Sequence, residues 1–189
     1  NHGTGCTLSA AITAALARGY ELADAIVLGK MSVTQGLRAA CSIARGDGCV
    51  AHVGWPTGIE NLPAILPCRP DQFCQPDFPR CDSHNLGLYP VVDSVEWVER
   101  LLQEGVKTIQ LRIKHRSDTN LRDSIQQAVH LQHIYDAKLF INDHWQLAIE
   151  YGAYGAHLGQ EDMDSADLDA IANAGLRLGL SNHAWHEIA

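Results

Sequence analysis

From residue 87 onward, short apolar runs alternate with longer amphipathic stretches. The apolar runs cover residues 87–93, 108–114, 138–143, 154–159 and 176–182, and the amphipathic stretches cover residues 95–106, 121–136, 144–153 and 165–175. Short apolar runs are typical of buried strands, and apolar residues at helical spacing are typical of helices. Regular alternation of strand and helix predicts an α/β domain whose parallel strands are joined by crossover helices.

Two architectures share this alternation, namely a doubly wound sheet and a (β/α)8 barrel. A complete barrel has eight strands and typically about 250 residues, whereas residues 87–189 offer five strand candidates. If the domain is a barrel, we therefore expect a partial (β/α)8 TIM barrel of these five strands.

The first 50 residues show a different pattern. Residues 7–18 are rich in Ala and Leu and are followed by Gly19, which suits a helix with a glycine just past its end. Residues 21–46 carry apolar side chains at helical spacing, at Leu22, Ile26, Val33, Leu37, Cys41 and Ala44, and Gly46 offers a stop. We expect two consecutive helices in this part of the chain.

Six of the seven prolines lie between residues 54 and 85. Proline removes a backbone donor and disfavours helical geometry at the preceding residue, so this stretch is neither a regular helix nor a central strand. We interpret residues 51–86 as a linker between two domains. The linker contains Cys68, Cys74, Cys81 and His84, but their spacing lacks the short pairs of structural zinc sites, so we do not predict zinc there.

The bulk properties exclude several classes of partner and location. The net charge of −8 argues against a nucleic-acid partner. No apolar run approaches the roughly 18 residues that a membrane span needs, so we expect no membrane partner. The six cysteines contain no C-x-x-C pair, which favours free thiols in a reducing cytoplasm.

A glycine-rich turn made of Gly3, Thr4, Gly5 and Cys6 precedes the first expected helix, which we expect to start near Thr7. Glycines allow close backbone approach, and a helix N-terminus favours an anion such as phosphate. The same place favours the thiolate of Cys6, which could act as a base or charge partner for a substrate hydroxyl. A tight turn with a buried cysteine is the alternative interpretation.

In the second half, polar residues gather where the predicted strands end. Gln110, Arg112 and Lys114 occupy alternate positions and so share one face, which suits a polyanion. Asn142 and Asp143 end the third predicted strand, and His157 and Asp162 lie around the end of the fourth. Two carboxylates facing two cationic side chains suit Mg²⁺ bound to a diphosphate.

Each of these side chains also has an ordinary structural explanation. The polar face of the second strand could point to solvent, although parallel strands covered by helices have little wet surface. Either aspartate alone could be a helix cap. His157 alone could be a packed histidine.

The segment "HGTGCTLSAAI" followed by "LARG" resembles the end of the hydroxymethylpyrimidine and phosphomethylpyrimidine kinases, which have a ribokinase-like fold. This resemblance covers residues 1 to about 50. It implies that Gly3, Thr4 and Gly5 bind the transferred phosphoryl group, that Cys6 faces the substrate hydroxyl as a catalytic residue, and that ATP is the co-substrate.

The segments "GLYPVVD", "QLRIK", "FIND", "GAHLGQED" and "LGLSNH" are similar to thiamine-phosphate synthase, a (β/α)8 enzyme, in the same order. That family joins hydroxymethylpyrimidine pyrophosphate to a thiazole phosphate and releases pyrophosphate. The resemblance makes Arg112, Lys114 and Asn142 pyrophosphate contacts, the first two of them catalytic, and makes Asp143 and Asp162 ligands of Mg²⁺. It places Tyr89, Gln110 and His157 in the pyrimidine site and Ser181 close to the phosphates.

Together the two resemblances predict a piece of a bifunctional enzyme of thiamine biosynthesis. Residues 1–50 would be the C-terminal end of the kinase domain, residues 51–86 the linker, and residues 87–189 the N-terminal part of the synthase barrel. We expect this piece by itself to lack both activities and the partners to be small-molecule substrates. The alternatives are a barrel resembling the thiazole tautomerases and a non-catalytic module that binds pyrimidine or phosphate.

Overall fold

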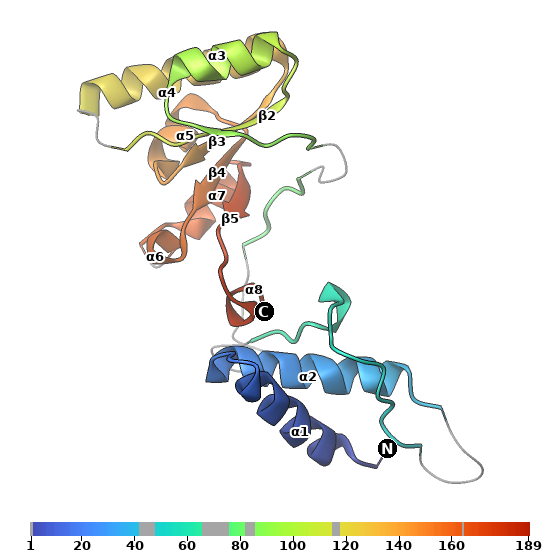
Figure 1. The fold of residues 1–189 in the computed structure, drawn as a ribbon. Coiled ribbons are helices and arrows are strands. Elements are labelled where there is room, and N and C mark those ends of the chain that lie inside the picture. The colour runs from blue at the N-terminus through green and yellow to red at the C-terminus, as the bar shows by residue number, and fades with distance from the viewer. Residues whose placement is uncertain (1, 42–47, 66–75, 82–85, 115–117, 164) are drawn as a thin grey trace. The chain divides into compact units, whose positions relative to one another are not determined.

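The computed structural model describes residues 2–41, 48–65, 76–81, 86–114, 118–163 and 165–189. The chain divides into two compact units (Figure 1). Unit 1 comprises Asn1–Phe73 together with Asn182–Ala189, and unit 2 comprises Cys74–Ser181.

Unit 2 is built on a sheet of five parallel strands, which are β1 (Val91–Val92), β2 (Thr108–Leu111), β3 (Lys138–Asn142), β4 (Gly155–Leu158) and β5 (Arg177–Leu180). Each strand pairs with the next one along the chain, in the order β1-β2-β3-β4-β5. A doubly wound sheet reverses its order at a switch point, whereas a barrel adds each new strand on the same side. The sequential order therefore confirms the barrel-like interpretation and excludes the doubly wound alternative.

Helices connect the strands, as the alternation predicts. The connecting helices are α3 (Val95–Gln103), α4 (Asp118–Tyr135), α5 (Trp145–Tyr151) and α7 (Leu168–Asn173), and a short α6 (Gln160–Met163) follows β4. Ser94 and Asp167 cap α3 and α7 by accepting hydrogen bonds from the backbone amides of Trp97 and Ala170, at 3.5 and 2.9 Å. Such caps satisfy amides that the first helical turn leaves without a partner.

The strands of unit 2 bury one side against these helices. Ile109, Leu111 and Ile113 on and just after β2 join the same apolar core as Leu139 and Ile141 on β3. Because side chains alternate across a strand, the residues between them face the other side of the sheet. That other face carries the polar residues from which the candidate site is built.

Unit 1 contains α1 (Thr4–Ala17), α2 (Leu22–Arg38), a 3-10 turn η1 (Ile59–Asn61) and α8 (Trp185–Ile188). The first two helices pack against each other around Ala15, Ala25, Leu28 and Met31. Gly29 allows the close approach, because a Cβ there would lie 2.6 Å from Ile12 Cγ1.

Three details of unit 1 differ from expectation. The first helix starts at Thr4 instead of Thr7, since Gly3 takes a left-handed conformation (φ 87°) and serves as its N-cap. The second helix ends at Arg38, well before Gly46. The apolar series that begins with Leu22 and Ile26 is largely exposed, at 61% and 49% for these two residues. Val33 of the same series is buried, and the core of this unit takes Ala25, Val27, Leu28 and Met31 from the second helix.

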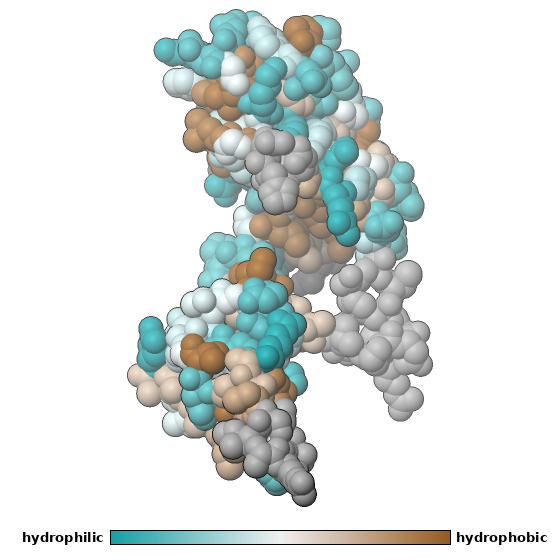
Figure 2. Space-filling view, turned by 90° about the vertical axis from the view of Figure 1, so that its right-hand side faces the viewer, coloured by the Kyte–Doolittle hydropathy of each residue, from teal (hydrophilic) through white to brown (hydrophobic). Residues whose placement is uncertain are grey.

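Hydrophobic residues are visible at the surface of both units (Figure 2). In unit 2, Val91 on the edge strand β1 is 54% exposed. None of the helices among the described residues is long and apolar enough to cross a membrane.

The described parts of the proline-rich stretch contain no regular element besides η1, as predicted. Phe78 packs against the core of unit 2, and Cys81 Sγ lies 3.8 Å from the hydroxyl of Tyr154. Cys68, Cys74 and His84 lie outside the described residues. The other four cysteines are free thiols.

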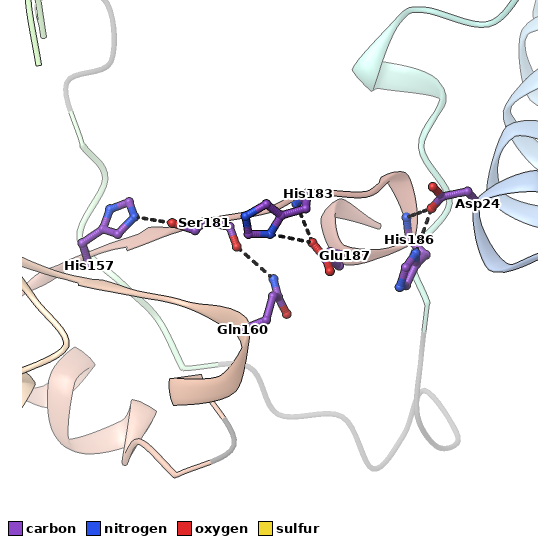
Figure 3. A network of polar contacts seen from close by, with 7 residues as sticks. All are labelled: Asp24, His157, Gln160, Ser181, His183, His186 and Glu187. Carbon is purple, nitrogen blue, oxygen red and sulfur yellow. Dashed lines mark hydrogen bonds and ion pairs between the residues drawn. The ribbon is translucent and has the colours of Figure 1, made fainter. Parts of the chain in front are cut away.

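An ion pair ties α8 to α2 within unit 1 (Figure 3). Both the backbone amide and the ring Nδ1 of His186 contact Asp24 Oδ1, at 3.0 and 2.8 Å. Burial by itself would raise the pKa of Asp24, but the hydrogen bonds and charge of His186 outweigh it and hold this pKa below its usual value. Trp185 also packs against the core of this unit.

We expect Asp24→Asn to destabilise unit 1 at neutral pH and to have little effect in strong acid. A lowered folded-state pKa gives stabilisation that is present above the unfolded pKa of about 3.9 and is lost as the pH falls through the folded value. The expected loss is about 1 kcal/mol, because the His186 ring is partly exposed and solvent screens the pair. Thermal unfolding of the variant and the wild type at neutral pH and in strong acid checks this prediction. Glu21→Gln, at an exposed position, is the control.

Candidate active site

The candidate site lies at the carboxyl ends of the parallel strands. The register pairs Asn142 on β3 with His157 on β4, and His157 with Gly179 on β5. One step further, the amide of Asp143 donates to the carbonyl of His157 at 3.0 Å, and the amide of Ser181 donates to the carbonyl of Leu158 at 3.0 Å. These backbone bonds fix the residues that follow β3 and β5 relative to β4.

Asp143 and Asp162 meet at this edge of the sheet. Their carboxyl groups lie close enough for Asp162 to act on the pKa of Asp143, and Asp162 Oδ2 accepts a hydrogen bond from the amide of Gly159 at 3.3 Å. The side-chain amide of Asn142 donates to Asp143 Oδ1. The structure therefore brings together three of the side chains that the sequence singled out.

Burial and the neighbouring charge of Asp162 raise the pKa of Asp143, while the charges of His144 and Arg112 act in the opposite direction. Two carboxylates in contact repel each other unless a proton or a cation lies between them. Mg²⁺ is commonly held by one or two carboxylates together with water and substrate phosphates. Within the described ranges no group of three or more His, Cys, Asp or Glu side chains could hold a metal ion, and a two-carboxylate Mg²⁺ site needs no such group.

His157, Ser181 and Gln160 form a second group (Figure 3). His157 Nε2 lies 2.9 Å from Ser181 Oγ, and the side-chain amide of Gln160 donates to the Ser181 carbonyl at 3.3 Å. Burial, followed by the charge of Arg112, lowers the pKa of His157. Its Nδ1 is buried and has no hydrogen-bond partner among the described residues. A neutral ring with its proton on Nε2 fits best, because a charged ring would bury an unpaired N–H.

Tyr89 lies beside this group and is largely buried. Its hydroxyl accepts a hydrogen bond from the Gln110 side-chain amide at 3.1 Å. Burial raises the pKa of Tyr89 to about 12, so the phenol is neutral at physiological pH. Its ring packs edge-on against Phe140 and tilted against His157, with centroids 5.5 and 6.4 Å apart. The three residues predicted for the pyrimidine site are therefore neighbours.

Two glycines make room for these rings. A Cβ at Gly155 would lie 2.6 Å from Phe140 Cε1, and a Cβ at Gly179 would lie 2.6 Å from His157 Nδ1. Neither glycine has a positive φ. These positions need glycine because a larger side chain would clash with the ring of Phe140 or His157, and not because the backbone needs a special conformation.

Arg112 and Lys114 are exposed and line a cavity of ≈ 730 Å³ beside β1, together with Asp93 and Trp97. The amide of Arg112 donates to the Val92 carbonyl at 2.7 Å. The charge of Arg112 acts on the pKa of both Asp143 and His157, so its guanidinium lies near both groups. For Lys114, the structure gives only its place in the wall of this cavity.

The glycine-rich turn lies in unit 1, at the start of α1. Because the helix begins at Thr4, the amides of Thr4, Gly5 and Cys6 are those of a first helical turn, which has no helical acceptors for them. Cys6 is exposed and lines a cavity of ≈ 380 Å³ with Gly3, His2 and Cys49. The geometry suits an anion near Gly3 and Cys6.

His144 is a residue that the sequence analysis missed. It follows Asp143, and its ring Nε2 lies 3.3 Å from the carbonyl oxygen of Ile113. The two residues are 31 positions apart and belong to no shared local motif. Only a three-dimensional structure could have paired them.

Comparison with known families divides the chain into two segments. Residues 88–189 match the profile described as thiamine monophosphate synthase, and residues 1–51 match the profile described as phosphomethylpyrimidine kinase. The chain therefore joins a segment like the C-terminal region of such a kinase to a segment like such a synthase.

Individual relatives carry the same description. A thiamine-phosphate synthase of Enterobacter sp. (strain 638) is 60% identical over 114 residues, which are 60% of this chain and 54% of that protein. One from Serratia proteamaculans (strain 568) is 63% identical over 106 residues, 56% of this chain and 50% of that protein. The solved thiamine phosphate pyrophosphorylase from Pyrococcus furiosus is 32% identical with a TM-score of 0.47, covering 51% of this chain and 50% of that one. The chain spans about half the length of the curated relatives it matches.

We expect Gly179→Ala to displace the His157 ring and break its hydrogen bond to Ser181. The added methyl group would clash with Nδ1, and overpacking of this kind costs about 1–3 kcal/mol. Histidine NMR signals and thermal unfolding report the change. Ala174→Ser adds one heavy atom at an exposed position and serves as the control; equal effects of the two variants would contradict the packing role of Gly179.

Proposed function

The chain belongs to the thiamine monophosphate synthase family, and on this premise we propose that it works in thiamine biosynthesis as part of a bifunctional transferase. Unit 2 would contribute to joining hydroxymethylpyrimidine pyrophosphate to a thiazole phosphate with release of pyrophosphate. The single observation that carries this proposal is the meeting of Asp143 and Asp162 beside Arg112 at the ends of parallel strands. Opposed charges arranged in this way suit a diphosphate leaving group.

The bond that breaks joins the methylene carbon of the pyrimidine to a diphosphate oxygen. Arg112, Lys114 and Asn142 would bind the diphosphate, and Asp143 with Asp162 would hold Mg²⁺. The ion, when bound, would neutralise part of the charge that develops on the leaving group. The resulting pyrimidine-methyl cation would be captured by the thiazole nitrogen.

The neutral residues of the site would orient the pyrimidine ring. The Tyr89 hydroxyl accepts from Gln110, so its own hydrogen is available to donate to a ring nitrogen. If His157 donates from Nε2 to Ser181 Oγ, the Ser181 hydroxyl hydrogen can point to a phosphate oxygen. Because burial keeps Tyr89 and His157 uncharged, neither adds a charge that would compete with the diphosphate.

The kinase-like segment supports a second activity in the same pathway. We propose that Gly3, Thr4 and Gly5 bind the transferred phosphoryl group of ATP and that Cys6 faces the hydroxyl of hydroxymethylpyrimidine. The exposed thiol at the first turn of α1 supports this assignment. The product of the kinase would be the substrate of the synthase, which gives a chemical reason for joining the two segments. The domain boundaries 1–50, 51–86 and 87–189 and the cytoplasmic location remain predictions.

We expect Asp143→Asn to lower Mg²⁺-dependent pyrophosphate release by roughly a hundredfold or more in the full natural protein, because a charge that stabilises the departing group is lost. The assay supplies both phosphorylated substrates and measures pyrophosphate. Asp169→Asn, which removes an exposed carboxylate from α7, is the matched control. A rate for Asp143→Asn equal to that of the control would contradict the proposed Mg²⁺ site.

We expect Cys6→Ala to lower ATP-dependent phosphorylation of hydroxymethylpyrimidine by roughly a hundredfold, the scale of a lost acid–base group. Pyrophosphate release from the preformed diphosphate substrate should be unchanged, since Cys6 belongs to unit 1. Cys41→Ala replaces another exposed free thiol and is the control. An undiminished kinase rate in Cys6→Ala would rule out this role.

A further inference from the structure

The contact between His144 and Ile113 links two strands of the candidate site. The Ile113 carbonyl can only accept a hydrogen bond, so the ring Nε2, which lies 3.3 Å away, must carry the hydrogen and donate it. The backbone pairing of β2 with β3 ends at Leu111 and Ile141. The His144 side chain therefore supplies a cross-strand bond beyond the point where the backbone pairing stops.

Both ends of this bond adjoin residues of the candidate site. Ile113 stands between Arg112 and Lys114, and its own side chain is anchored in the core at 6% exposure. At the other end, His144 directly follows Asp143. One side-chain hydrogen bond thus connects the segment that carries the cations to the turn that carries a carboxylate.

The turn at Asp143 has an uncommon backbone conformation. Asp143 has a φ of 62°, a left-handed conformation that is uncommon outside glycine and that aspartate tolerates better than most residues. Such conformations persist where surrounding contacts hold them, and they are common at functional sites. The amide of His144 donates to the Asn142 carbonyl at 2.7 Å, and the amide of Trp145 donates to the Asp143 carbonyl at 3.0 Å. The ring of His144 adds a contact from outside the turn.

Local helix stability does not account for this histidine. His144 occupies the N-cap position of α5, yet its side chain makes no capping hydrogen bond. Serine, aspartate and asparagine are better caps than histidine. The ring is directed to β2 instead of to the helix that it precedes.

We propose that His144 is a positioning residue of the synthase site, which fixes the spacing between the cations at Arg112 and Lys114 and the carboxylate of Asp143. The inference rests on the proposed function, because it assigns a role within that same site. Without the tether, the cations and the carboxylate can separate, and a diphosphate with its ion is bound less well.

The test uses His144→Ser and His144→Gln in the full natural protein. Serine can cap α5 but cannot reach Ile113, whereas the glutamine amide offers a donor at a reach similar to Nε2. We expect His144→Ser to raise KM for the diphosphate substrate roughly tenfold, the scale of one lost hydrogen bond, with kcat within about threefold. The melting temperature should be unchanged or higher. His144→Gln should restore most of the affinity.

Two further measurements separate the possible outcomes. Calorimetry with inorganic pyrophosphate and Mg²⁺ should show the same loss of affinity in His144→Ser, and His133→Ser and His133→Gln on the exposed end of α4 serve as controls. The positioning role would be overturned if His144→Ser had the same KM and pyrophosphate affinity as the His133 variants. It would also be overturned if His144→Gln were as impaired as His144→Ser. In both cases the wild-type protein would still turn over its substrates. A wild-type protein that releases no pyrophosphate would instead overturn the proposed function itself.

Discussion

The register of the parallel strands is the constraint on which the candidate site depends. All the paired strands run parallel, so the residues that follow each strand emerge at the same end of the sheet. Asn142 pairs with His157, and the Asp143 amide donates a hydrogen bond to the His157 carbonyl. These two contacts fix the position of the Asp143 carboxylate relative to β4. A shift of one residue would turn these side chains toward the apolar core.

Burial gives the site a consistent electrostatic character. It raises the pKa of Asp143 and Tyr89 and lowers that of His157, so each group is shifted toward its neutral form. Arg112 and Lys114 are exposed and line the cavity beside β1. A half-buried interior beside exposed cations suits a ligand with a flat, uncharged ring at one end and phosphates at the other. Bound Mg²⁺ would favour the charged form of Asp143, because an opposite charge stabilises a carboxylate.

Much of this arrangement could be predicted from the sequence. The alternation of apolar and amphipathic segments is a local property, and it predicted the five strands and the four connecting helices of unit 2. The positions where the strands end could also be predicted from the local sequence. Because parallel strands end on the same side of a sheet, Asp143 and Asp162 could be expected to lie close together. The functional roles of these residues rest on family resemblance and stay proposals.

What the sequence determined by itself was therefore the kind and order of elements and the residues at their ends, because these follow from spacing along the chain. Only the tertiary structure decided the strand order, which face of α2 packs, why Gly155 and Gly179 must be small, and that His144 reaches Ile113. Each of these depends on which surfaces meet across long separations in sequence. A local sequence pattern does not specify which distant surfaces come into contact, because these contacts depend on the packing and hydrogen bonding of the whole fold.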